Sequence, residues 1–200
     1  MKLTLNSSKD PEYWDPIYKK TLIIIDFQKD FINGSLAVPG AQEAEDAIVN
    51  YIKANHNLLE KVIFTVDWHG PNHCSFKKNG GIWPVHCVQY SEGAGISDRL
   101  INLCIEYNLT INVVKKGDND NQEEYGAFNK PFINTDRISF EPKYPIIVCG
   151  LAGDYCVKES IKNLLKTENF DIEVFKDGVA SIDDGTTFNN FIKENNLTVI

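Results

Sequence analysis

Short apolar runs alternate with amphipathic segments along almost the whole chain, and this alternation restricts the possible fold more than any other feature. Runs such as IIVC at 146–149 are apolar at every position, which is typical of strands covered on both faces. Strands are predicted at 21–25, 62–66, 111–114, 146–149, 172–175 and 197–200, and helices at 41–55, 155–166, 185–194 and in a segment that begins after Ser97. The pattern predicts an α/β fold: a single doubly wound domain with a mainly parallel sheet flanked by helices on both faces.

Length and composition are those of an ordinary globular protein. The 200 residues suffice for one domain with a sizeable core, and hydrophobic and charged residues make up 42% and 24% of them. Residues 21–200 are predicted to form this domain, and residues 1–20 an N-terminal extension. The formal net charge of −8, with lysines scattered rather than clustered, argues against nucleic acid or an anionic membrane as a partner.

The start of the chain and its cysteines indicate the compartment. Residues 1–20 contain no apolar stretch long enough for a signal peptide, and no run in the chain is long enough to span a bilayer. The five cysteines include no CxxC pair, and free thiols are the expected state. A cytoplasmic protein is therefore predicted.

Polar residues follow four of the predicted strands. Asp26 follows the first strand, the second runs into Asp67 and His69, the third runs into Lys116, and the fourth leads through a glycine-rich turn to Cys156. Ligands of doubly wound sheets bind beyond the carboxyl ends of the strands. These residues are therefore candidates for a functional site.

Cys156 opens a predicted helix, where the helix dipole and the free N–H groups favour an anion. This position predicts an acidified, reactive thiol, with Asp154 as the N-cap of the helix. The alternative is a buried structural cysteine, an interpretation that suits Cys104 and Cys149 because both lie inside apolar segments.

Asp26 and Lys116 indicate a catalytic site only in combination with Cys156. Alone, an aspartate after a strand commonly caps the next loop, and a lysine at a strand end is commonly solvated. A thiol, a carboxylate and an ammonium at neighbouring strand ends instead supply a nucleophile, its base and a cation that stabilises the anionic forms. The combination indicates nucleophilic catalysis more strongly than any one of its members.

Histidines gather in one stretch of the chain. Asp67 and His69 are two positions apart on an extended segment, so their side chains point to the same face, and His73 and His86 follow. Carboxylate and imidazole groups bind zinc, iron or manganese, and no cysteine is needed as a ligand, which favours an open, catalytic type of site. The alternative is a chance pairing that binds nothing.

Three aromatic residues lie in loops beside these segments: Phe31, Trp83 and Tyr125. Residues of this kind either line a flat apolar pocket or form the edge of the core. Their positions alone do not choose between the two.

Five separated blocks of sequence carry a resemblance to a known family. They lie at 26–31, 67–76, 83–88, 116–117 and 150–157, and together they resemble the nicotinamidases of the isochorismatase-like hydrolase superfamily over residues 21–185. The resemblance implies a parallel-sheet α/β fold. It also implies hydrolysis of nicotinamide to nicotinate and ammonia through a cysteine thioester, in NAD salvage.

The resemblance also implies roles for single residues. It assigns Asp26, Lys116 and Cys156 to a catalytic triad, the backbone N–H groups of Ala152 and Cys156 to an oxyanion hole after a cis peptide bond, and Phe31, Trp83 and Tyr125 to the ring pocket. It assigns Asp67, His69 and His86 to one divalent metal ion, zinc before iron or manganese, and His73 matches a ligand found in some members only. Gly153 replaces the family's usual threonine, which predicts a looser oxyanion turn.

Two other functions compete with this interpretation. One is a different isochorismatase-like amidohydrolase that acts on a ureido or N-carbamoyl substrate, and such enzymes generally lack the cluster of Asp67, His69 and His86. The other is a non-enzymatic metal- or thiol-binding protein, which would leave Asp26 and Lys116 without a role. The expected partner is a small molecule, nicotinamide, and a homo-oligomer is left open.

Overall fold

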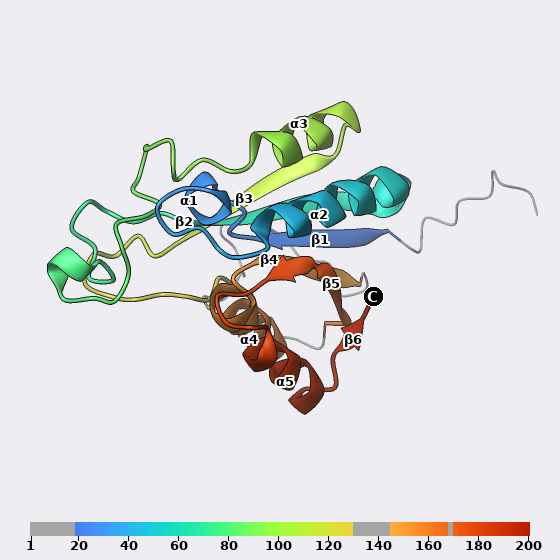
Figure 1. The fold of residues 1–200 in the computed structure, drawn as a ribbon. Coiled ribbons are helices and arrows are strands. Elements are labelled where there is room, and N and C mark those ends of the chain that lie inside the picture. The colour runs from blue at the N-terminus through green and yellow to red at the C-terminus, as the bar shows by residue number, and fades with distance from the viewer. Residues whose placement is uncertain (1–18, 130–144, 168–169) are drawn as a thin grey trace, which may run out of the picture.

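The computed structural model describes residues 19–129, 145–167 and 170–200, so the predicted extension at 1–20 lies almost wholly outside the described residues. Its strands form one parallel sheet in the order β3-β2-β1-β4-β5-β6. They are β1 (Lys20–Ile25), β2 (Leu59–Asp67), β3 (Thr110–Lys116), β4 (Ile146–Leu151), β5 (Ile172–Ala180) and β6 (Thr198–Val199). The predicted doubly wound α/β domain is confirmed (Figure 1).

Helices cover both faces of the sheet, with α2 and α3 on one side and α4 and α5 on the other (Figure 1). The helices are α1 (Lys29–Ile32), α2 (Ala41–Asn55), α3 (Asp98–Glu106), α4 (Lys158–Thr167) and α5 (Thr186–Glu194), with short 3-10 turns η2 (His56–Leu58) and η3 (Lys77–Asn79) and a π-helical turn η4 (Gly153–Val157). Ser97 caps α3 as predicted, because its hydroxyl accepts a hydrogen bond from the backbone N–H of Leu100. No described helix is long and apolar enough to cross a membrane.

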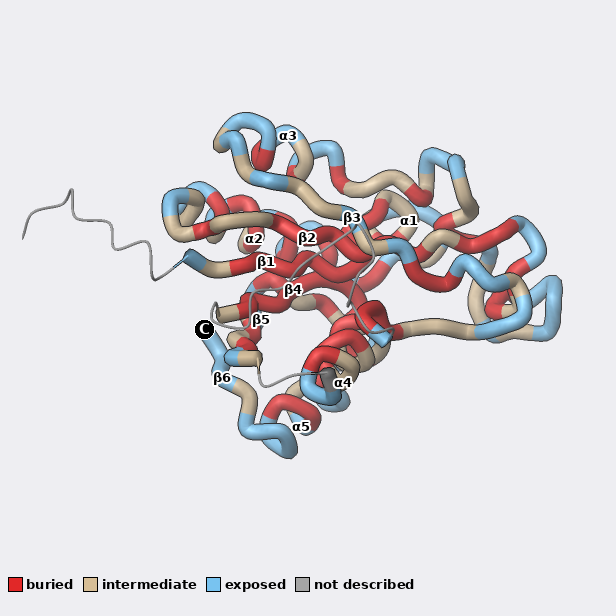
Figure 2. Tube along the Cα trace, turned by 180° about the vertical axis from the view of Figure 1, so that it is seen from behind, coloured by how far each residue is buried: buried red, intermediate tan, exposed pale blue. Residues whose placement is uncertain are grey.

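Alternation along β1 divides the interior into two cores. Leu22 and Ile24 pack with α2 and α3, whereas Ile23 and Ile25 pack with α4 and α5. All four side chains are fully buried, and the buried trace of the sheet lies between the two helical layers in Figure 2. Full burial of each such side chain contributes about 1.5–3 kcal/mol to folding, which explains why β1 is apolar at all four positions from Leu22 to Ile25.

Two predicted boundaries were wrong. The helix expected at 155–166 is instead the π-helical turn η4 followed by α4. The strand expected at 172–175 continues as β5 to Ala180, past the exposed Lys176 and Asp177, because Val179 and Ala180 pair with the end of β4 beyond a register shift. The polar residues on this solvent-facing stretch of β5 resemble a loop in the sequence, so the strand was predicted to end too early.

The parallel arrangement places the carboxyl ends of the strands at one edge of the sheet. The long segments that follow β2 and β3 extend beyond this edge, on the left in Figure 1, and the turn after β4 leads there into η4. The candidate residues of the sequence therefore meet at one end of the molecule.

Candidate active site

Lys116 is the centre of a buried cluster of charged residues. It ends β3 in register with Asp67 at the end of β2 and exposes only 2% of its surface. Its ammonium Nζ lies 2.8 Å from Asp26 Oδ2 and 3.5 Å from Cys156 Sγ, and it donates a hydrogen bond to Asp67 Oδ1. The structure thus brings together the thiol, the carboxylate and the ammonium that follow three different strands in the sequence.

The position of Asp26 is set by β2. Its backbone has a φ of 47°, in the left-handed region, and its N–H donates to the carbonyl of Thr65 at 3.1 Å. The hydroxyl of Thr65 donates to Asp26 Oδ1 at 2.6 Å, so one oxygen of the carboxylate binds threonine and the other faces Lys116.

Burial and neighbouring charges together set the pKa values of the charged groups in this cluster. Burial alone would lower the pKa of Lys116, but attraction to Asp26 and then to Asp67 raises it well above its usual value. Burial alone would raise the pKa of Asp67, but Lys116 and His69 lower it below its usual value. Burial raises the pKa of Asp26 above its usual value, and the nearby ammonium only partly opposes this.

The expected acidification of Cys156 is wrong. Burial raises the pKa of its thiol well above the usual value, and Lys116 only partly offsets this while Asp26 and Asp67 add to it. The sequence suggested the effect of the helix start but not the loss of solvent or the two nearby carboxylates. A thiol that keeps its proton needs a base at the moment of attack, and Asp26 is the carboxylate with a raised pKa beside it.

A group of three candidate metal ligands, Asp67, His69 and His86, shares Asp67 with this cluster. Asp67 Oδ2 lies 3.5 Å from His69 Nε2 and 3.8 Å from His86 Nε2. Ligand atoms about 2.0–2.1 Å from a tetrahedral zinc ion stand roughly 3.3 Å apart, so a small contraction would close this group around one ion. Two imidazoles and one carboxylate with an open position form a donor set for zinc, iron or manganese.

Both imidazoles are oriented by backbone carbonyls. His69 Nδ1 lies 2.8 Å from the carbonyl oxygen of Gly117, and His86 Nδ1 lies 2.8 Å from that of Pro84. A carbonyl can only accept, so Nδ1 carries the proton in each ring and Nε2 presents its lone pair to the shared space. His69 Nε2 is buried without a hydrogen-bond partner, which is the state of an atom that suits a metal ion.

His73 does not join these three residues. Its ring stacks beside that of His69 with centroids 4.0 Å apart, but Nδ1 bonds to Ser75 Oγ at 2.8 Å and Nε2 to the carbonyl of Gln122 at 3.2 Å. Both ring nitrogens are therefore engaged away from the ligand group, and Asp67, His69 and His86 are the set that converges.

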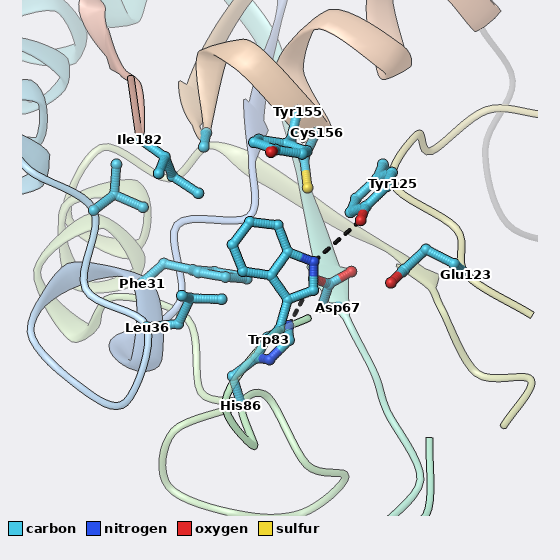
Figure 3. A pocket seen from close by; sticks show the side chains of 12 residues that line it. Phe31, Leu36, Asp67, Trp83, His86, Glu123, Tyr125, Tyr155, Cys156 and Ile182 are labelled. Atoms are coloured by element: carbon cyan, nitrogen blue, oxygen red, sulfur yellow. Dashed lines mark hydrogen bonds and ion pairs between the residues drawn. The ribbon is translucent and has the colours of Figure 1, made fainter. Parts of the chain in front are cut away.

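An aromatic pocket lies between the two groups. Phe31, Trp83 and Tyr125 line it together with Cys156, whose sulfur points into the pocket in Figure 3. Trp83 Nε1 donates a hydrogen bond to the hydroxyl of Tyr125 at 3.1 Å, which links the loop after β2 to the segment after β3.

Sequence reasoning missed several residues of this pocket: Leu36, Val38, Glu123, Tyr155 and Ile182. The ring of Tyr155 lies 5.1 Å from that of Trp83 and 5.3 Å from that of Tyr125, centroid to centroid. Its place next to Cys156 in the sequence was a usable signal. Leu36, Val38 and Ile182 gave no signal, because they are single aliphatic residues in segments without distinctive chemistry.

The turn that carries Cys156 differs from expectation at Asp154. The N-cap position of η4 is Ala152, and Asp154 instead accepts hydrogen bonds from the backbone N–H groups of Ile182 and Asp183, both at 3.0 Å. The peptide bond between Leu151 and Ala152 is cis, as the resemblance implied.

The predicted looseness at Gly153 is not what the structure shows. Gly153 is buried, and a Cβ added there would lie 2.5 Å from Ser181 Oγ. A neighbouring serine therefore occupies the space that a side chain at this position would need, and the turn is closely packed.

Similarity to individual proteins places the chain in a family, although no family model matches the chain. The nicotinamidase of Escherichia coli is 31% identical over 185 residues, which cover 82% of this chain and 84% of that protein. The chain belongs to the nicotinamidase family. It is an amidohydrolase with the isochorismatase-like α/β fold.

Solved structures agree with this membership. A yeast nicotinamidase bound to the inhibitor nicotinaldehyde is 26% identical, covers 90% of this chain and 99% of its own, and superposes with a TM-score of 0.73. A pyrazinamidase of Pyrococcus horikoshii in complex with zinc is 26% identical, with coverages of 91% and 98% and a TM-score of 0.69.

Gly117 provides a test of the ligand group in this nicotinamidase-family chain. Its φ is 64°, and a Cβ there would lie 2.6 Å from His69 Cε1. We expect Gly117→Ala to displace the imidazole and weaken zinc binding by about 10–100-fold, the usual effect of disturbing a ligand's orientation. Isothermal titration with Zn²⁺ measures this.

Gly80→Ala is the matched control for this experiment. Gly80 also has a positive φ, 94°, but nothing lies within 4 Å of a Cβ placed there. The control should bind zinc like the unmodified chain despite similar backbone strain. Equal zinc affinity in Gly117→Ala would mean that His69 is not a ligand.

Proposed function

We propose that the chain is a nicotinamidase that hydrolyses nicotinamide to nicotinate and ammonia, with a thioester on Cys156 as the intermediate. The observation that carries this is the placement of one aromatic pocket between Cys156 on one side and Asp67 and His86 on the other. A flat ring that bears a carboxamide and a ring nitrogen matches both ends of such a pocket. Names and ligands of the related proteins support the same substrate.

The reaction begins with transfer of the Cys156 proton to Asp26 as the sulfur attacks the carboxamide carbon. The carbonyl oxygen becomes an oxyanion, held by the backbone N–H groups of Ala152 and Cys156, each worth about 3 kcal/mol of barrier at comparable sites. Asp26 returns the proton to the nitrogen, the C–N bond breaks and ammonia leaves.

Hydrolysis of the thioester completes the cycle. Asp26 accepts a proton from water as the water oxygen attacks the thioester carbon, and the C–S bond then breaks to release nicotinate. The sulfur regains its proton and the thiol is restored. Throughout, Lys116 stays charged, since it lies between two carboxylates and its pKa is held well above its usual value.

The metal ligands act at the other end of the pocket. Asp67, His69 and His86 would hold one divalent ion, zinc in preference to iron or manganese, and a bound ion supplies a Lewis-acid partner for the ring nitrogen. Phe31, Trp83 and Tyr125 enclose the ring and exclude water. Production of nicotinate in the cytoplasm would serve NAD salvage.

Removing the nucleophile tests the covalent mechanism. We expect Cys156→Ala to reduce ammonia release from nicotinamide to the background rate, because alanine fills the turn but cannot attack the carbonyl. Cys74→Ala is the control, since Cys74 is a partly exposed thiol outside the pocket and should keep full activity. Circular dichroism checks that both variants fold. Substantial turnover by folded Cys156→Ala would refute the thioester.

The pH dependence of kcat/KM tests the base. Activity should fall as pH drops through the pKa of Asp26, which burial raises above the usual value of 3.8, because the protonated carboxyl cannot accept the thiol proton. Thr65→Val removes a hydrogen bond that stabilises the carboxylate, so it should move the acid limb upward by about one pH unit. The measurements are made at saturating zinc. If Thr65→Val does not move the acid limb of the pH profile, that limb reports the titration of a group other than Asp26.

Benzamide distinguishes a nicotinamidase from a general amidase. It has the shape of nicotinamide but presents a C–H where nicotinamide has the ring nitrogen, and the three aromatic residues would contact both rings equally. Sites that require a polar partner reject analogues lacking it by about 10⁴-fold, so kcat/KM should be lower by that order. His69→Ala should narrow the gap by slowing nicotinamide selectively. Similar rates for the two amides on the zinc-loaded protein would refute the role of the ion at the ring nitrogen and favour a broader amidohydrolase of the superfamily.

A further inference from the structure

Asp154 joins two segments that meet beside the pocket. It lies in η4, two residues before Cys156, and exposes 6% of its surface. Its Oδ1 accepts the N–H of Ile182 and its Oδ2 accepts the N–H of Asp183, both at 3.0 Å. A carboxylate is suited to this task because each oxygen accepts from one of two adjacent donors.

The same two segments are in van der Waals contact at Gly153. A Cβ there would lie 2.5 Å from Ser181 Oγ and 2.9 Å from Val179 Cγ1, so the end of β5 and the residue after it pack directly on the nucleophile turn. The hydrogen bonds of Asp154 and this contact fix the backbone at 181–183 relative to Cys156.

Ile182 is the residue that this connection places in the pocket. Its side chain lines the pocket with Phe31, Ala152 and Cys156, and 38% of its surface stays exposed. Asp154 does not line the pocket, and both of its carboxylate oxygens are engaged by the backbone N–H groups of Ile182 and Asp183. The geometry therefore gives Asp154 a contact with the loop and none with the space that the substrate would occupy.

We propose that Asp154 is a positioning residue that holds Ile182 as a side wall of the ring pocket, and that Ile182 determines which ring substituents the enzyme accepts. This inference rests on the proposed function for its substrate, a pyridine carboxamide. Asp154 acts only through the backbone N–H groups of Ile182 and Asp183.

The relative kcat/KM values for substituted nicotinamides test the role of Ile182 as a side wall of the pocket. The substrates are nicotinamide and a panel with one methyl group at ring carbon 2, 4, 5 or 6. Ile182→Ala should raise kcat/KM for at least one methylated substrate, relative to nicotinamide, by about tenfold, the usual effect of a change in pocket size. Asp154→Asn should raise the same ratio for the same substrate, and mainly through KM, because the amide group offers one acceptor and opposes the second N–H.

Two comparisons separate positioning from a general loss of structure. Asp183→Asn is the same substitution in the same loop, where the carboxylate accepts from Gly185 and Thr187 and does not line the pocket, and it should leave the ratio unchanged. The double variant Ile182→Ala with Asp154→Asn should shift the ratio no further than Ile182→Ala alone, since both changes remove the same wall. An additive shift, or a loss of kcat in Asp154→Asn with an unchanged ratio, would overturn the proposal.

Amide hydrogen exchange tests the connection without any substrate. Asp154→Asn should speed exchange at the N–H groups of Ile182 and Asp183 by tenfold or more and leave Ile161 in α4 unaffected. Unchanged exchange at residues 182 and 183 would overturn the positioning role. If Asp154→Asn does not fold, Asp154→Ser, with one acceptor, replaces it in both experiments. Failure of the unmodified chain to release ammonia from nicotinamide would instead refute the proposed function, and the exchange result would still decide the role of Asp154.

Discussion

A buried ammonium group is the interaction on which this site depends. Lys116 exposes 2% of its surface, and a cation so placed is tolerated only when anions surround it. Asp26 and Asp67 meet this requirement from the ends of β1 and β2, and parallel pairing in register brings all three to one edge. Loss of either carboxylate would remove one of the two anions that hold the buried ammonium, so the cluster constrains three strands at once.

Asp67 belongs to both halves of the site. Its Oδ1 accepts from Lys116, whereas its Oδ2 faces His69 and His86, so one side chain connects the cluster around the nucleophile to the ligand group. The two ends of the pocket are thereby held at a fixed separation. This rigidity suits the proposed reaction, in which the ring is held at one end while the amide meets Cys156 at the other, because a misplacement of about 1 Å can cost 10²-fold in rate.

The sequence predicted those features that follow from strand ends and failed for those that depend on loops and solvent. Asp26, Asp67 and Lys116 could be found because each follows an apolar run, and the sheet brings such positions together. The direction in which the pKa of Cys156 shifts could not be predicted, since burial is a property of the folded chain. Asp154 looked like a helix cap, but its partners lie 28 and 29 residues away in a loop that no local pattern connects to it.

The approach of Asp26 to Cys156 also depends on a residue without a side chain. Gly150 pairs with Ile25 between β4 and β1, directly before the points where β1 leads to Asp26 and β4 leads to the turn that carries Cys156. A Cβ at Gly150 would lie 2.2 Å from the carbonyl oxygen of Ile25, and its φ of 127° is one that other residues rarely adopt. Any larger residue would push the strand ends apart at the point where the carboxylate of Asp26 and the sulfur of Cys156 lie close together. The chemistry at this edge of the sheet is therefore constrained by backbone contact as much as by the charged side chains themselves.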